Sequence, residues 1–157
     1  MRRTLLLCAI LAIGCSKSDQ PPADSAQVQN TAPPAISLAD VAGTWEGSVM
    51  TETSDSVIAV QMLTATADPM TWTMTVANAK TPTKTVAVPV TGVVAAGDSI
   101  VIQSGPFDSV LRPGQKVSIH SITRLQDGKL VMVIHATYVA NNEMIPLRGT
   151  ATRKMAP

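Results

Sequence analysis

Two histidines, His120 and His135, are the residues best placed to do chemistry together, and the chain has no others. They flank an Asp127-Gly128 step, which is typical of a two-residue β-hairpin turn. Counting outward from that turn places His120 opposite His135, on the face away from the apolar residues of both strands. Imidazoles on paired positions can lie about 5 Å apart at Cβ, close enough to share a metal ion. Zinc normally takes three or four protein ligands, so we expect a solvent-facing pair without a metal.

Met70, Trp72 and Met74 alternate along the chain and could place two thioethers and an indole on one strand face. Soft sulfur ligands of this kind select Cu(I). Any buried strand shows the same spacing, however, and methionine commonly fills gaps in a core. We therefore expect core packing here.

The acidic residues recur in Asp-Ser steps at predicted turns, where both side chains bond the local backbone. The steps are Asp55-Ser56, Asp98-Ser99 and Asp108-Ser109. The chain contains no nucleophile-elbow serine motif and no glycine-rich phosphate loop. We therefore expect no enzyme activity and no cofactor.

The composition favours one domain with a tail: 157 residues, of which 45% are apolar, 3% aromatic and 15% charged. The formal charge is +1 without a basic block, so nothing supports nucleic-acid binding through phosphate neutralisation. Charged residues are also too scarce for a long solvent-exposed helix.

The N-terminus predicts export. After Met1-Arg2-Arg3, an apolar run of about ten residues has the size of a signal-peptide core and is too short to span a membrane. The following Leu11-Ala12-Ile13-Gly14-Cys15 resembles the lipobox of bacterial lipoproteins, with Ala12 where leucine is usual. The resemblance implies removal of residues 1–14 and a lipidated Cys15. Because Ser16 follows rather than aspartate, it also implies an outer-membrane anchor facing the periplasm.

Residues 15–37 are rich in Pro, Ala, Ser, Gln and Asp, a composition that buries too little apolar surface to fold. We expect a disordered tether after the lipidated cysteine, and a folded domain over residues 38–157. No second linker follows, and we expect the domain to be a monomer.

From Val41 onward the apolar residues recur with period two, and turn signals recur every eight to fifteen residues. This predicts about eight antiparallel strands in an all-β up-and-down barrel, with a β-sandwich as the alternative. Pro89 and Pro146 fall within predicted strands, so we expect both at an edge or a bulge.

The barrel is favoured by Gly43-Thr44-Trp45, which resembles the Gly-x-Trp signature of lipocalin-like (calycin) barrels. In that family the tryptophan closes the barrel base and an arginine of the last strand packs over the indole. The resemblance therefore implies that Trp45 closes this barrel with Arg148 or Arg153.

The irregular segment 105–114 carries the sole phenylalanine, Phe107, and we expect it to cover one barrel end as a lid or plug. With Trp72 and Tyr138, Phe107 is a candidate lid or ligand-contacting residue. We expect a cell-envelope lipoprotein whose barrel binds a small apolar or amphipathic molecule. The alternative is a structural or interaction lipoprotein without a ligand. An interior void of about 300 Å³ or more would favour binding, and a filled interior would favour interaction.

Overall fold

The computed structural model describes residues 34–155, which belong to one compact unit, Ala32–Pro157. The predicted signal peptide, Cys15 and most of the predicted tether lie outside the described residues. Within residues 34–155, no helix is long and apolar enough to cross a membrane.

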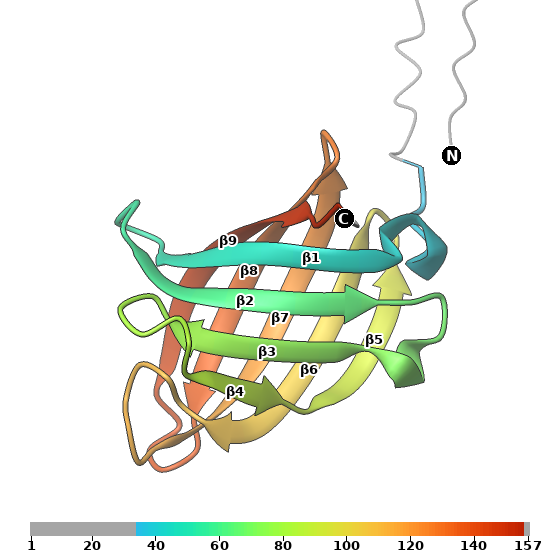
Figure 1. The fold of residues 1–157 in the computed structure, drawn as a ribbon. Helices are drawn as coiled ribbons and strands as arrows, with labels where there is room; N and C mark the ends of the chain where they lie inside the picture. The colour runs from blue at the N-terminus through green and yellow to red at the C-terminus, as the bar shows by residue number, and fades with distance from the viewer. Residues whose placement is uncertain (1–33, 156–157) are drawn as a thin grey trace, which may run out of the picture. The chain divides into compact units, whose positions relative to one another are not determined.

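The described part of the chain folds into nine antiparallel strands that form one sheet, curled into a nearly closed barrel (Figure 1). Two short 3₁₀ helices, η1 (Leu38–Val41) and η2 (Pro69–Thr71), precede β1 and β3. The strands are β1 (Gly43–Thr51), β2 (Val57–Ala65), β3 (Thr73–Asn78), β4 (Thr85–Val88), β5 (Val90–Ala96), β6 (Ser99–Asp108), β7 (Lys116–Gln126), β8 (Lys129–Tyr138) and β9 (Met144–Arg153). The order is β4-β3-β2-β1-β9-β8-β7-β6-β5, so β9 returns to pair with β1. The predicted all-β barrel is confirmed.

The barrel has nine strands rather than about eight because Pro89 divides one segment in two. β4 pairs with β3 and β5 pairs with β6, with only Pro89 between them. Proline has no N–H to donate to a ladder, so the segment changes partner there. The Pro89 carbonyl accepts from the Gly105 N–H at 2.8 Å, which joins this junction to β6.

Pro146 occupies the other predicted edge position. It pairs with His135 of β8, whereas the pairing of β9 with β1 begins one residue later, at Leu147. Pro146 therefore lies at a partly unpaired position of β9, as predicted, whereas Pro89 lies between two strands rather than within one.

The hairpin of β7 and β8 has the predicted turn and register. Asp127 and Gly128 both have positive φ, 50° and 73°, as a type I′ turn requires. His120 therefore pairs with His135, and Leu125 with Leu130.

The strand predicted to carry Met70, Trp72 and Met74 on one face is shorter than expected. The Asp68 side chain accepts from the Met70 N–H at 2.9 Å and caps η2, so that β3 begins only at Thr73. Met70 is 88% exposed, while Trp72 is buried. The expectation of one shared, buried face was wrong because a side-chain cap and Pro69 start a 3₁₀ turn there.

Candidate functional site

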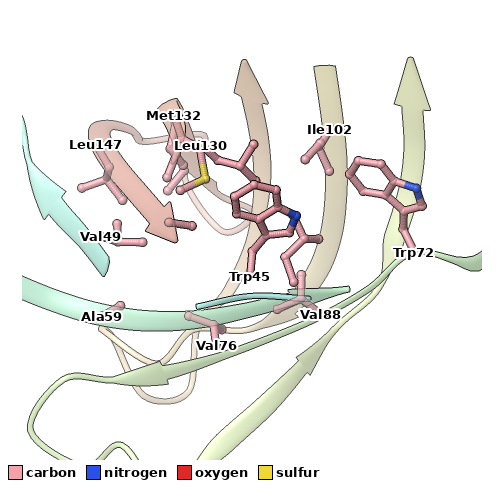
Figure 2. Close-up of a cluster of buried hydrophobic side chains, with 14 of the residues drawn as sticks. Trp45, Val49, Ala59, Trp72, Val76, Val88, Ile102, Leu130, Met132 and Leu147 are labelled. Atoms are coloured by element: carbon pink, nitrogen blue, oxygen red, sulfur yellow. The ribbon is translucent and has the colours of Figure 1, made fainter. Parts of the chain in front are cut away.

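Trp45 fills the barrel end next to η1 and is completely buried. Its indole Nε1 donates to the Val41 carbonyl at 2.8 Å. Figure 2 shows the ring inside the cluster of buried side chains. Because the N–H is bonded and the ring is surrounded, Trp45 closes this end without leaving a polar group unpaired.

Arg153 is the arginine that the structure brings to Trp45. Its guanidinium carbon lies 4.6 Å from the centre of the indole, and its nitrogens donate to the carbonyls of Ala42 and Asp40. A Cβ at Gly43, whose φ is 138°, would lie 2.7 Å from Arg153 Nη1. The glycine of the Gly-x-Trp segment therefore makes room for the arginine.

Arg148, the other candidate arginine, lies on the outer face. It donates to the carbonyls of Thr51 and Ser54 at 3.2 and 3.1 Å, and forms an ion pair with Asp55. The period of two contains the signal that separates the two arginines. Arg153 shares the parity of inward-facing Leu147 and Ala151, whereas Arg148 does not.

Trp72 also belongs to the end near η1. Its Nε1 donates to the Thr66 carbonyl at 2.8 Å, in the connection between β2 and β3. It does not border the interior cavity, whereas Phe107 and Tyr138 do. The three aromatic candidates are therefore not one cluster.

The opposite end is covered by residues 109–115, which we call the lid segment, and by the connection between β8 and β9 (Figure 1). Residues 105–108 of the segment predicted to be irregular belong instead to β6. Val110 and Leu111 of the lid segment are partly buried, pack against the core and line the interior cavity. The Asn78 side chain donates to the Val110 carbonyl at 3.0 Å. The Ser109 hydroxyl accepts from the Leu111 and Arg112 N–H groups and lies 3.3 Å from the Tyr138 hydroxyl.

Arg112 joins the lid segment to the neighbouring connection. Its guanidinium stacks 4.3 Å from the Tyr138 ring centre and forms two hydrogen bonds with Glu143, of 2.6 and 2.8 Å. These bonds, with one from Asn141, lower the pKa of Glu143 to about 2, and the pKa of Arg112 is raised in turn. The pair therefore stays ionised across the physiological pH range.

The cavity beneath the lid segment measures about 60 Å³. Its lining is almost entirely apolar and includes Phe107, Leu111 and Tyr138, with Ser109, Ser121 and Gln61 as polar exceptions. Pockets for small-molecule ligands span about 300–1,000 Å³. The interior is therefore filled mainly by the protein's own side chains.

A larger hollow of about 350 Å³ lies on the outside of the barrel. It runs over β1, β2 and β3 and is bordered by Pro82, in the connection to β4, and by Thr85, the first residue of β4. The outward-facing Val60 and Met62 line it, and Met62 is 40% exposed. Sequence reasoning missed this hollow, although two apolar residues at outward positions of one strand were a signal for it.

His120 and His135 lie side by side on the outer wall of β7 and β8. Their ring centres are 6.3 Å apart and the ring planes differ by 8°. In the described part of the chain, no three His, Cys, Asp or Glu side chains are grouped as a metal site.

The Asp-Ser steps stay apart from one another and make local contacts. Asp98 accepts from the Ser99 hydroxyl at 2.6 Å and from Arg124 at 3.0 Å, and these bonds lower its pKa. Asp55 pairs with Arg148, and Asp108 with Lys116. The described carboxylates of these steps thus serve turns and ion pairs.

Comparison of the chain with family models, with curated proteins and with solved structures finds no match. The lipocalin-like resemblance therefore rests on Gly43-Thr44-Trp45, and the lipobox resemblance on the segment that ends in Gly14-Cys15.

Proposed function

We propose that this chain is a cell-envelope lipoprotein anchored through lipid on Cys15, in the outer membrane facing the periplasm where two membranes exist. The support is the positively charged start, the short apolar run and the Gly14-Cys15 pair that ends it. A single acyl chain gives only marginal membrane binding, whereas several acyl chains on one cysteine anchor a protein stably.

Globomycin, which blocks lipoprotein signal peptidase, tests the anchor. We expect the precursor to accumulate under treatment, and Cys15→Ser to lose incorporation of labelled palmitate. Normal processing in globomycin, or unchanged labelling of Cys15→Ser, would contradict the anchor.

We further propose that the barrel acts as an interaction module that presents its outer surface to an envelope partner. The observation that carries this is the difference between the two hollows: about 60 Å³ inside and about 350 Å³ on the outer face of β1 to β3. The larger hollow is partly apolar, and exposed apolar surface of this kind often marks contact sites.

Site-specific photocrosslinking in the native host tests this role. A photoreactive phenylalanine derivative at Met62, in the outer hollow, should give one adduct of defined mass. The matched control is Val94, which is 61% exposed on the outer face of β5 and distant in the sheet order. No adduct from position 62, or equal adducts from both positions, would contradict the proposal.

A second candidate function is binding of a small apolar or amphipathic molecule beneath the lid segment. One observation favours it: the almost entirely apolar lining of the cavity. Outward movement of Val110 and Leu111 would enlarge the cavity by the volume of both side chains.

Native mass spectrometry of the chain purified from its own host separates the two functions. A reproducible non-covalent adduct, lost when Ala136→Phe fills the cavity, would establish the ligand. A chain free of adducts in both forms would leave the interaction role.

A further inference from the structure

The outer wall of the β7–β8 hairpin holds the two histidines in a fixed relation. The tight turn at Asp127-Gly128 sets the register, and each strand has a second partner, β6 or β9. The Cβ atoms of His120 and His135 are thus held by backbone pairing on all sides. Neither position can drift from the other without breaking the sheet.

The two rings lie face to face. Their centres are 6.3 Å apart and their planes are nearly parallel, at 8°. Neither ring forms a hydrogen bond or ion pair with any described residue. Their nitrogens are therefore available to an external partner, since a neutral imidazole offers one lone pair.

The hairpin positions around the pair, and the two positions that pair directly with the histidines from outside the hairpin, carry no charge. Gln103 of β6 and Pro146 of β9 flank it in the same row. The neighbouring outward rows of the hairpin contain Ser118 opposite Thr137, and Ile122 opposite Val133.

The nearest outward-facing cations along these strands are each paired with a carboxylate. Lys116 pairs with Asp108, Arg124 with Asp98, and Arg148 with Asp55. A metal ion at the histidines would therefore meet no unpaired positive charge on the adjacent outward positions.

We propose that His120 and His135 form a two-imidazole chelate for a late first-row divalent cation, with Cu²⁺ bound most tightly. Imidazole suits these ions, and affinities rise along the series to Cu²⁺. Rotation about side-chain bonds brings a nitrogen of each ring to about 2 Å from one ion, a typical metal–imidazole distance, while the backbone stays in place.

The number of ligands explains why the sequence predicts a histidine pair without a metal: two histidines are fewer than a zinc site normally uses. A closed structural zinc site needs four protein ligands. Cu²⁺ in tetragonal geometry accepts two imidazoles and completes its coordination with water or with ligands from another molecule. The site is accordingly open and exchangeable.

Titration with Cu²⁺, followed by electron paramagnetic resonance, tests the site in the full chain. The protein is purified in detergent without a polyhistidine tag, and carries Cys8→Ser and Cys15→Ser to remove competing thiols. We expect one Cu²⁺ per chain with two coupled imidazole nitrogens. His120→Gln and His135→Gln should each lower the affinity about tenfold or more, because the second ligand no longer acts within the same molecule.

A matched control keeps two histidines but breaks their pairing. The double variant His120→Ser, Val94→His moves one ring to an exposed position on β5, three strands away from His135 in the sheet order. It should bind no better than the single variants, with circular dichroism confirming the fold. Equal affinity of the parent chain and His120→Gln, or parent-like affinity of the double variant, would overturn the proposal.

Discussion

The two ends of the barrel are closed in different ways. At the end near η1, Trp45 is fully buried, and its indole and the Arg153 guanidinium bond to main-chain carbonyls. At the other end, the lid segment lies over a cavity of about 60 Å³ and is tied largely by side chains, namely those of Asn78, Ser109 and Arg112.

The two ends of the barrel should therefore differ in how easily they open. A closure built from a buried ring and main-chain acceptors opens only when the core opens. At the other end, the ion pair of Arg112 with Glu143 is exposed, and exposed ion pairs contribute little to global stability, so the lid segment can open locally. Any ligand would therefore enter at the lid segment.

Loss of Trp45 should have the largest effect. We expect Trp45→Ala to lower the free energy of unfolding by about 3–5 kcal/mol, because a buried ring and its packing are removed. Leu111→Ala, at the partly buried lid end, should cost about 1–2 kcal/mol. Urea unfolding followed by circular dichroism measures both. Equal losses would mean that the two ends are equally packed.

Arg153 should contribute less than the ring it covers. Arg153→Ala should cost about 1 kcal/mol, the scale of an exposed cation–π contact. Arg153→Lys keeps the charge without the planar stacking and should recover only part of this loss. Arg148→Ala is the matched control, since it leaves Trp45 untouched. A larger loss from Arg148→Ala than from Arg153→Ala would be evidence against closure by Arg153.

Arg112→Ala should act locally. Because this variant lacks the bonds to Glu143, we expect two backbone amides of the lid segment to exchange hydrogen roughly tenfold faster. These are the amides of Leu111 and of the alanine at position 112. Amides of β1 beside Trp45 should keep their protection, and the melting temperature should change little. Hydrogen exchange with mass spectrometry reads both regions at once. Faster exchange throughout the barrel would show that the two ends open together.

The smallest effect concerns pH. The pKa of Glu143 is about 2 in the folded protein against an ordinary value of 4.5, so its stabilising contribution is complete above pH 4.5. The contribution is lost as the pH falls from 4.5 toward 2, because the unfolded chain takes up the proton first. The stability difference between the parent chain and Glu143→Gln should therefore be constant near neutral pH and shrink below pH 4.5. Unfolding curves across this range measure it, and a change confined to neutral pH would contradict the assignment.

Local signals in the sequence predicted the strands and one register well. Asp127-Gly128 determines the pairing of His120 with His135 because a two-residue turn leaves no freedom in the count. Pro89 marks a strand break for an equally local reason, the missing N–H. The expectation at Met70 failed where the Asp68 side chain caps a 3₁₀ turn, a short-range competitor that the period of two conceals.

The sequence by itself thus determined the all-β class, the turns, the inward and outward faces of the hairpin, and the resemblances that suggest export and barrel closure. The period of two already separates inward-facing Arg153 from outward-facing Arg148. Only the tertiary structure decided that the interior void is small and that the larger hollow lies outside. Those properties depend on how side chains that are far apart in the sequence pack against one another. Alternation along one strand reports which face a residue occupies, but it carries no information about what fills the space beyond that face.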